Sequence, residues 1–345
     1  MRNDAPRSVL VIQTAFIGDA LLAVPLLKAV KDLWPGAGLD VLVRPPADNL
    51  LETLPYLREI IIYDKRGADR GLSGLLQLRR RLRDKKYDLA LLPHRSFRSG
   101  LLAYGAGIPI RVGFDRGGGR HFHTVRIPYP TNGHEIVRNL QLLTPFGPFP
   151  QPELPEIMST KEDVELVNRR LDPVSGAERI ALAPGSVWYT KRWPEDYFIE
   201  LGGRFIQKGY QVVLLGSGED RDLCSRIAVA LSDSCINFAG QTTLRQSIEI
   251  LRRCAALITN DSAPTHLGVA AGTRVLTIFG STSPQFGFYP FGPKGKSLEI
   301  ELYCRPCTDH GRRNCPEKHL RCLKDITPDR AFAEVDKMLA TMPAQ

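Results

Sequence analysis

The fold is decided by Arg179-Ile-Ala-Leu-Ala-Pro-Gly185, which runs into Ser186-Val-Trp-Tyr-Thr-Lys-Arg-Trp-Pro194. A second stretch has the same form: Ala255-Ala-Leu-Ile258 runs into Thr259-Asn-Asp-Ser-Ala-Pro-Thr-His266. Each begins as a short apolar run, typical of a buried parallel strand, and leads into a segment with helical periodicity. Junctions of this kind lie at the carboxyl ends of strands in an open parallel sheet, where ligands bind.

The same alternation of strands and helices extends along the chain. In the first half we expect strands at Ser8–Gln13, Asp40–Val43, Glu59–Tyr63 and Tyr87–Leu92, and helices at Asp19–Leu33, kinked at Pro25, and at Glu135–Leu143. In the second half we expect strands at Ile180–Ala183, Gln211–Leu215, Cys235–Ala239, Ala255–Thr259 and Arg274–Phe279. The helices between them are expected at Glu195–Lys208, Asp220–Leu231, Leu244–Arg252 and Pro264–Ala271.

A proline-rich stretch separates the two halves. Pro145-Phe-Gly-Pro-Phe-Pro-Gln-Pro152 has four prolines in eight residues, which excludes a helix or a central strand and indicates a linker. The chain of 345 residues is long enough for two domains. We therefore predict α/β domains at 1–150 and 151–345 with a cleft between them, and we allow for a C-terminal helix that packs back on the first domain.

The composition is that of a globular protein, with 43% hydrophobic and 24% charged residues. No apolar run approaches the roughly 20 residues that a membrane-spanning helix needs. The apolar stretch Ser8-Val-Leu-Val-Ile12 is too short for a signal peptide. A cytoplasmic protein is expected.

The net charge of +9 lies entirely in the first half. Residues 1–150 hold 22 Lys and Arg against 13 Asp and Glu, whereas residues 151–345 hold 24 of each kind. The basic run Arg79–Lys86 is interpreted as a solvated helix face. In the span from His94 to Arg126, Asp115 is the one acid, and glycines and prolines predict loops and turns. Nucleic acid, an anionic membrane surface or a phosphorylated substrate would each suit such a patch.

The two junctions of the second half offer groups that suit a diphosphate joined to hydroxyls, as in a nucleotide-sugar. Lys191 supplies a cation, and Asp261 and Ser262 precede a predicted helix start, where backbone N–H groups face an anion. His266 shares a helix face with Ser262 at i,i+4. The full set expected at this donor site is Ser186, Thr190, Lys191, Glu219, Asp261, Ser262, Ala263 and His266.

Each of these residues also has a purely structural interpretation. Lysine is usually a surface residue, and Asp261 and Ser262 are suited to helix capping. His266 could be a core histidine. Glu219 follows a strand, where a carboxylate can bond a ribose hydroxyl, but an exposed acid at a helix start is the alternative.

Asp19 follows the first strand and also has two interpretations. As a helix N-cap it would satisfy backbone N–H groups and offset the helix dipole. As a general base it would take the proton of an attacking hydroxyl. The sequence pattern alone leaves both open.

The seven cysteines fall into two groups. Cys224, Cys235 and Cys254 lie on apolar patterns typical of core residues. The other four, Cys304, Cys307, Cys315 and Cys322, are spaced closely enough to hold a structural zinc. Disulfides and free thiols are the alternatives.

Five motifs occur in order along the chain: Phe16-Ile-Gly-Asp19, Lys191-Arg-Trp-Pro194, Ala239-Gly-Gln-Thr242, Asn260-Asp-Ser-Ala-Pro-Thr-His266 and Phe279-Gly-Ser-Thr282. Together they resemble the ADP-heptose:lipopolysaccharide heptosyltransferases of glycosyltransferase family 9. The resemblance extends to the terminal Asp325-Ile-Thr-Pro328. The second and third motifs are closer to type II, which is favoured, and Gln13-Thr-Ala-Phe-Ile-Gly-Asp19 is closer to type I. Ala263 replaces the glycine that often follows Asn-Asp-Ser in the family.

The resemblance implies a GT-B fold, with two Rossmann-like α/β/α domains and an interdomain cleft. It implies an inverting, metal-independent enzyme that needs no cofactor and moves heptose from ADP-heptose to the lipopolysaccharide inner core, on a Kdo/heptose–lipid A acceptor. The C-terminal domain would hold the donor and the N-terminal domain the acceptor. Asp19 would be the general base and Lys191 would stabilise the leaving diphosphate.

The basic half then has an expected partner. Five arginines are candidates to hold the carboxylates and phosphates of the acceptor: Arg95, Arg98, Arg111, Arg116 and Arg120. The protein would attach peripherally to the anionic inner face of the inner membrane.

Two other functions use the same features. A basic, zinc-stabilised nucleic-acid-binding protein would use the charged half and the cysteines, but aromatic residues are not interleaved with the basic ones as stacking requires, apart from Phe97 and Phe122, so no nucleic-acid partner is expected. A non-catalytic ADP-sugar-binding protein would bind the donor without needing Asp19.

Overall fold

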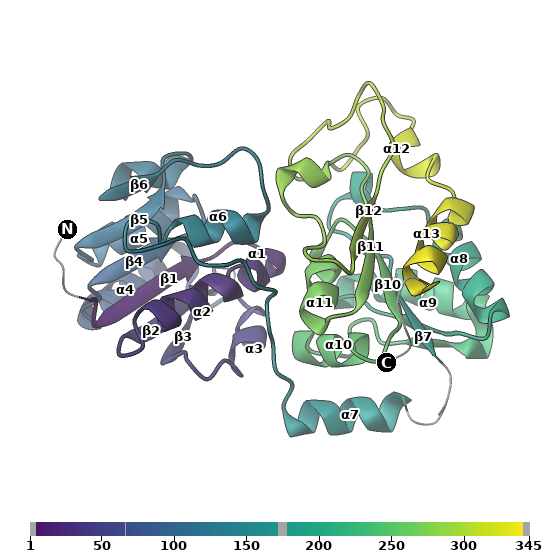
Figure 1. Cartoon of the computed structure of the whole chain (residues 1–345), viewed down its shortest axis with the longest axis horizontal. Helices are drawn as coiled ribbons and strands as arrows, with labels where there is room; N and C mark the ends of the chain where they lie inside the picture. Colours follow the sequence, from purple (N-terminus) through teal and green to yellow (C-terminus); the bar gives the residue numbers. More distant parts are fainter. Residues whose placement is uncertain (1–4, 66, 172–177, 341–345) are drawn as a thin grey trace. The chain divides into compact units, whose positions relative to one another are not determined.

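The computed structural model describes residues 5–65, 67–171 and 178–340, and the chain divides into two compact units, Met1–Ile157 and Met158–Gln345 (Figure 1). The proline-rich stretch lies between α6 (Glu135–Gln141) and α7 (Lys161–Leu171), in a segment that contains no helix or strand. The boundary between the two units lies after Ile157, seven residues beyond the boundary predicted at residue 150.

Unit 1 is built on a six-stranded parallel sheet with the strand order β3-β2-β1-β4-β5-β6. Every residue of the central strand β1 is buried, because helices cover both faces of the sheet. The strands are β1 (Ser8–Gln13), β2 (Gly38–Val43), β3 (Glu59–Ile62), β4 (Leu89–Leu92), β5 (Ile110–Phe114) and β6 (Val125–Ile127).

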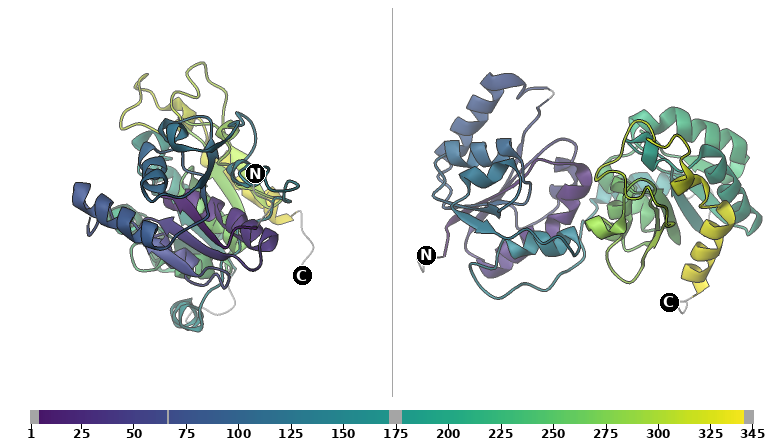
Figure 2. Two further views of the ribbon diagram at one scale, coloured as in Figure 1. Left: turned by 90° about the vertical axis from the view of Figure 1, so that its left-hand side faces the viewer. Right: turned by 90° about the horizontal axis from the view of Figure 1, so that it is seen from above.

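Two groups of helices flank this sheet (Figures 1 and 2). On one face α2 (Val24–Leu33) packs against α6 and α1 (Ile17–Leu22), and on the other α4 (Gly71–Asp84) packs against α5 (Phe97–Gly105). The short helix α3 (Asp48–Leu51) contacts β3, and the 3₁₀ helix η1 (Gly118–Phe122) contacts α5.

Unit 2 repeats the architecture with the strand order β12-β11-β10-β7-β8-β9, again parallel throughout. Its strands are β7 (Arg179–Ala183), β8 (Gln211–Leu214), β9 (Cys235–Asn237), β10 (Ala256–Asn260), β11 (Arg274–Ile278) and β12 (Gly295–Leu298). Its longer helices are α8 (Glu195–Gln207), α9 (Arg221–Leu231), α10 (Leu244–Leu251), α11 (Ala263–Ala271) and α13 (Pro328–Ala340), with the short α12 (Arg321–Lys324) before the last.

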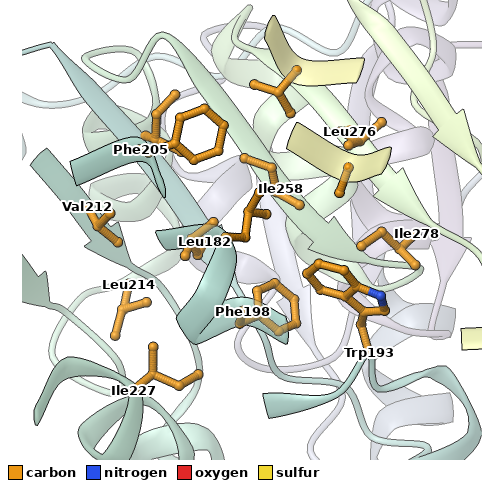
Figure 3. Packing of buried hydrophobic residues seen from close by; sticks show 14 of the residues in the cluster. Leu182, Trp193, Phe198, Phe205, Val212, Leu214, Ile227, Ile258, Leu276 and Ile278 are labelled. Atoms are coloured by element: carbon orange, nitrogen blue, oxygen red, sulfur yellow. The ribbon is translucent and has the colours of Figure 1, made fainter. Parts of the chain in front are cut away.

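An apolar cluster of unit 2 lies between its sheet and helices α8, α9 and α13 (Figure 3). Alternate strand residues such as Leu182 and Ile258 meet Phe198 and Phe205 of α8. Trp193, 2% exposed, completes the cluster, and its indole N–H donates to the carbonyl of Ile326 at 2.8 Å. A buried indole needs such an acceptor, so this bond joins the loop after β7 to the chain before α13.

Both sheets reverse their strand order at one point: between β1 and β4 in unit 1 and between β7 and β10 in unit 2. At such a point the loops that leave two adjacent strands diverge to opposite faces of the sheet and open a crevice at their carboxyl ends. The topology therefore singles out two ligand sites. Asp19 and His94 follow the strands of the first, and Lys191 and Asp261 follow those of the second.

Most predicted elements are confirmed within one or two residues, but the first helix is not continuous. We expected a kinked helix over Asp19–Leu33; the structure has α1 ending at Leu22 and α2 starting at Val24. Pro25 lies in the first turn of α2, where its missing N–H leaves no helical bond unmade, so the kink becomes a break.

One further expectation was wrong. The basic span from His94 to Arg126 is not made only of loops and turns, because it contains α5, β5 and β6. The C-terminal helix α13 packs within unit 2, against α8, with Ala331 and Val335 buried in the cluster of Figure 3. Among the described residues, no helix is both long and apolar enough to cross a membrane.

Candidate functional site

Lys191 and Asp261 form an ion pair at the strand-order reversal of unit 2. Lys191 Nζ lies 2.6 Å from Asp261 Oδ2 and donates to the Asp261 carbonyl at 3.2 Å. The carboxylate also accepts from Thr282 Oγ1 at 2.6 Å. Both charged side chains are nine-tenths buried or close to it, which makes their bonds stronger than those of a surface pair.

The backbone of the two loops is fixed by Asn260, the last residue of β10. Its side-chain amide donates to the Pro184 carbonyl at 2.8 Å, and its Oδ1 accepts from the backbone N–H of Trp193 at 2.9 Å. One buried side chain thus joins the loop after β7 to the loop after β10. This explains how residues 70 positions apart present Lys191 and Asp261 to each other.

Helix α11 begins directly after Asp261 with Ser262 in the N-cap position. Ser262 does not cap it by a side-chain bond: its hydroxyl donates to the carbonyls of Gly185 and Asn260 instead. In the first turn Pro264 has no N–H, and the Thr265 N–H donates to the Ser262 carbonyl at 3.0 Å. The N–H of Ala263 and the positive end of the helix dipole remain to attract an anion. A cation and a helix N-terminus meet at this edge, as the sequence predicted.

His266 lies in the second turn of α11 and is 5% exposed. Burial, and to a smaller extent Lys191, lower the pKa of this imidazole to about 4, so it is neutral at pH 7. Its Nδ1 is buried and has no hydrogen-bond partner among the described residues. A neutral ring with one unused nitrogen can bond a hydroxyl group of a ligand.

The other donor-site candidates differ in their surroundings. Ser186 is buried beside Lys191's loop, with its carbonyl accepting from Arg192, and Ala263 is the first residue of α11. Glu219 is exposed in the 3₁₀ turn after β8. Thr190 is 1% exposed, and its hydroxyl contacts Ser281 Oγ at 2.9 Å and the backbone of Arg312. Thr190 thus fastens two loops together.

Asp220 was missed by the sequence analysis, although it lies at the same edge. Its carboxylate accepts from the N–H and hydroxyl of Ser217 at 2.8 and 2.7 Å. A Cβ on Gly185 would come within 2.3 Å of this carboxylate, so only glycine fits in the loop after β7. Its position directly after Gly216-Ser-Gly-Glu219, and so just after a predicted strand, was the signal in the sequence that could have identified Asp220.

The cysteine-rich segment packs beside Thr190. Cys304, Cys307, Cys315 and Cys322 line one cavity of about 260 Å³ together with His319. Cys304 Sγ lies 3.9 Å from His319 Nε2, and all seven cysteines of the chain are free thiols. Burial raises the pKa of Cys322 to about 11.

In residues 5–65, 67–171 and 178–340, no three or more His, Cys, Asp or Glu side chains form a group that could hold a metal ion. Of the three alternatives for Cys304, Cys307, Cys315 and Cys322, structural zinc and disulfides are therefore not supported by their arrangement, whereas free thiols agree with it. Close spacing of four cysteines in the sequence does not by itself make their sulfur atoms converge on one point.

In unit 1, Asp19 lies in the first turn of α1, two residues after the helix begins. It is not the N-cap; that position is Phe16, whose backbone N–H donates to Asp19 Oδ2 at 3.1 Å. Asp19 is half-buried, so its carboxylate remains accessible at the strand-order reversal. The N-cap interpretation is therefore wrong in position, but Asp19 still makes a capping bond from the third residue of the helix. This bond is compatible with a role as general base.

Basic side chains gather at the same edge of this sheet. Arg44 directly follows β2, Lys65 follows β3, and the remaining members follow β4; we call Arg44, Lys65, His94, Arg95 and Arg98 the basic cluster. Burial first, and then Arg44 and Arg98, lower the pKa of Lys65 to about 8. His94 contacts Thr14 in the loop after β1 at 3.2 Å, and burial and the neighbouring cations lower its pKa to about 4.

The five predicted arginines do not form one group. Arg95 and Arg98 belong to the basic cluster and are exposed. Arg116 and Arg120 are exposed in the segment after β5, which contacts Arg95 through the bond from the N–H of Gly119 to the Arg95 carbonyl. These four lie at the carboxyl edge of the sheet or next to it.

Arg111 is placed differently. It lies near the amino end of β5, and its guanidinium donates to the carbonyls of Phe122, at 2.6 Å, and Ile108. Its role is to tie η1 to the sheet, so the structure does not bring Arg111 together with the other four. The sequence pattern could not show this, because strand β5 was not predicted. The end of the strand at which Arg111 lies was therefore unknown.

Behind Asp19 lies a buried ion pair that the sequence analysis also missed. Glu135 Oε2 accepts from Arg138 Nη1 at 3.1 Å, with both side chains almost fully buried on α6. Arg138 also donates to the Thr131 carbonyl at 3.1 Å and lies over the ring of Tyr129. Burial, and then Asp19, raise the pKa of Glu135 to about 7.

The two sites differ in chemistry. The unit 2 site offers a buried cation, a helix N-terminus and a neutral histidine, which suits a diphosphate ester that also carries hydroxyls. The unit 1 site offers one carboxylate beside a basic cluster, which suits proton removal from an anionic substrate.

Known proteins share this organisation. A model of glycosyltransferase family 9 (heptosyltransferase) matches residues 75–320. The chain is 28% identical to lipopolysaccharide heptosyltransferase 2 of Escherichia coli (strain K12), with 96% of this chain and 98% of that protein covered. It is 25% identical to lipopolysaccharide heptosyltransferase 1 of Pseudomonas aeruginosa, with the same shares covered.

Solved structures agree with these similarities. The structure of E. coli ADP-heptose LPS heptosyltransferase II is similar with a TM-score of 0.78, covering 96% of this chain and 98% of that one at 28% identity. A glycosyltransferase family 9 structure from Veillonella parvula has the same fold, with a TM-score of 0.87 at 22% identity over 97% and 98% of the two chains. The predicted GT-B fold class is confirmed, and the chain belongs to glycosyltransferase family 9, the heptosyltransferases.

Proposed function

We propose that this protein moves heptose from ADP-heptose to the inner core of lipopolysaccharide, by inversion and without a metal ion. The observation that carries the proposal is the buried Lys191–Asp261 pair beside the start of α11, where the N-cap residue Ser262 makes no side-chain capping bond. A diphosphate needs neutralisation as it departs, and these groups supply it without a metal. The relatives named heptosyltransferase 2 favour type II.

In the proposed reaction a hydroxyl oxygen of the acceptor forms a bond to the anomeric carbon of heptose. The bond from that carbon to the diphosphate breaks, and its electron pair leaves with ADP. The proton of the hydroxyl moves to the Asp19 carboxylate. Lys191 and the N-terminus of α11, with the N–H of Ala263, stabilise the charge that develops on the diphosphate, and His266 and Ser262 bond donor hydroxyls.

A transfer assay tests this function. ADP-heptose is incubated with the protein and inner-core acceptors that end either in Kdo or in heptose, with and without EDTA. We expect ADP release and a mass increase of one heptose on the acceptor, both unchanged by EDTA. Activity lost in EDTA and restored by a divalent ion would contradict the metal-free mechanism, and the preferred acceptor distinguishes types I and II.

The basic cluster is the proposed acceptor site, together with Arg116 and Arg120. Inner-core lipopolysaccharide presents carboxylates and phosphates, which pair with guanidinium and ammonium groups. The same charges favour reversible attachment to the anionic cytoplasmic face of the inner membrane, and salt should weaken it because screening acts beyond ~8 Å at physiological ionic strength.

Lys65 should make acceptor binding depend on pH. Its lowered pKa of about 8 means that it is charged below pH 8 and loses its proton as the pH rises further. Because the neutral amine no longer pairs with an anion, the acceptor KM should rise above pH 8, by at most about tenfold per pH unit. The Lys65→Arg variant stays charged and should show a flat acceptor KM to pH 9.5.

Steady-state kinetics from pH 6.5 to 9.5 check this prediction. Lys28→Arg is the matched control, since Lys28 pairs with Asp32 on the exposed face of α2 and should leave the pH dependence of the wild type intact. An acceptor KM that rises equally in Lys65→Arg and wild type would assign the dependence to another group.

A further inference from the structure

We propose that Glu135 is a positioning residue for the reaction: it faces the Asp19 carboxylate from α6 and makes Asp19 a stronger base. The inference rests on the proposed role of Asp19 and extends it to a residue that does not touch either substrate. Glu135 would act through its charge. An ionised Glu135 raises the free energy of the ionised Asp19 carboxylate and so raises the proton affinity of Asp19.

The packing of α6 on α1 brings the two carboxylates together. Asn139 Nδ2 of α6 donates to the Leu22 carbonyl at the end of α1, at 3.0 Å and fully buried. Glu135 lies one turn before Asn139 and Asp19 lies one turn before Leu22, so both share the faces that meet. Helices α1 and α6 contact each other, and Figure 1 shows them side by side.

The surroundings of Glu135 are unusual for a glutamate. It is 7% exposed, whereas glutamate is almost never buried unless it is paired. It is also the first residue of α6, where the helix dipole favours a negative charge and would lower its pKa. The pKa is nevertheless raised to about 7, by burial and then by Asp19, against the opposing effects of Arg138 and Arg95.

The need to hold the Arg138 side chain in place does not explain why residue 135 is a glutamate. The guanidinium of Arg138 is also held by the Thr131 carbonyl and by the Tyr129 ring, which lies between Arg138, at 5.1 Å, and Arg95, at 4.1 Å from the ring centroid. A glutamine at position 135 could accept from Arg138 with its amide oxygen and would not repel Asp19. The negative charge therefore adds repulsion of Asp19, which the pairing with Arg138 does not need.

The consequence is a base that strengthens near neutral pH. Below pH 7 Glu135 holds a proton, and Asp19 has a neutral neighbour. Above pH 7 Glu135 is ionised, so the proton affinity of Asp19 increases and the proton of the acceptor hydroxyl is taken more readily. The charged groups that act on Glu135 in this range are Asp19 of α1, Arg138 of α6 and Arg95 after β4. Burial and then Glu135 raise the pKa of Tyr129, after β6, so its hydroxyl stays protonated in this range.

The test compares single-turnover rates at saturating acceptor, where the titration of Lys65 does not contribute. The wild type should accelerate by roughly three- to tenfold between pH 6 and pH 8. Glu135→Gln should match the wild type at pH 6, where both side chains are neutral, and should not show this acceleration. Glu135→Asp should restore it, and Glu153→Gln, which alters an exposed glutamate of the same unit, should behave as wild type.

Stability provides a second readout in the same pH range. The pKa of Glu135 is raised above its ordinary value of 4.5, so ionising it in the folded state costs stability. The wild type should thus lose melting temperature relative to Glu135→Gln as the pH rises from about 4.5 to about 7. A structural role alone would make the glutamine variant less stable at every pH.

Two results would overturn the inference: an equal slowing of Glu135→Gln at pH 6 and pH 8, or an unchanged acceleration in that variant. Asp19→Asn separates this from the proposed function. If Asp19→Asn keeps its turnover, the base assignment itself fails, whatever Glu135 does. If Asp19→Asn is inactive while Glu135→Gln behaves as wild type at every pH, only the role of Glu135 fails.

Discussion

Replacing Asp19 by asparagine should lower turnover by ~10²–10⁴-fold, the range that a positioned general base contributes. The amide oxygen of asparagine can still accept from the Phe16 N–H, so the start of α1 should stay intact. Donor affinity should not change, because Lys191, Asp261 and α11 belong to unit 2. Single-turnover transfer, calorimetric titration with ADP-heptose and thermal melting measure the three quantities.

Asp32→Asn is the matched control for this prediction. Asp32 is an exposed carboxylate of α2 that pairs with Lys28 at 2.9 Å, so its loss should leave turnover within about twofold of wild type. A folded Asp19→Asn protein with near-normal turnover would make Asp19 a helix-capping residue and nothing more. An additional loss of melting temperature by several degrees would show that capping and catalysis cannot be separated at this position.

The central strands could be predicted because apolar runs bounded by Gly and Pro are a strong signal. Ser8–Gln13 was predicted to the residue. The edge strands β6 and β12 were missed, since three or four residues with Arg126 or Lys296 among them carry no clear pattern. Helix α5 was missed because Gly100 and Gly105 interrupt its periodicity.

The residues of the two candidate sites also differ in whether their convergence could be predicted from the sequence. Lys191, Asp261 and Ser262 directly follow strands whose neighbours could be inferred, so their convergence was predictable. Arg44 and Lys65 also follow strands, but their part in one basic cluster depends on β2 lying beside β1 and β3 beside β2. Glu135 depends on a tertiary contact with Asp19, more than a hundred residues earlier in the chain, which a single sequence does not reveal.

The second prediction with a large expected effect concerns the affinity for ADP-heptose and the role of Lys191 in it. Lys191→Ala should raise the dissociation constant of ADP-heptose by ~10–100-fold, since a charge-assisted bond contributes about 1.5–3 kcal/mol. The transfer rate at saturating donor should fall as well, because the departing diphosphate loses its cation. Lys208→Ala is the matched control: Lys208 pairs with Asp336 on the exposed side of unit 2 and should leave both quantities unchanged.

A double variant decides what the lysine does. Lys191→Ala leaves the buried Asp261 carboxylate with the Thr282 hydroxyl as its remaining side-chain partner among the described residues, facing the position proposed for a dianionic group. Part of the lost affinity therefore comes from repulsion, and adding Asp261→Asn should recover that part by removing the charge. The rest should persist, because no cation then faces the diphosphate. If the double variant instead bound and transferred like wild type, Lys191 would serve only to neutralise Asp261, and the diphosphate would have to be stabilised by the N-terminus of α11 alone.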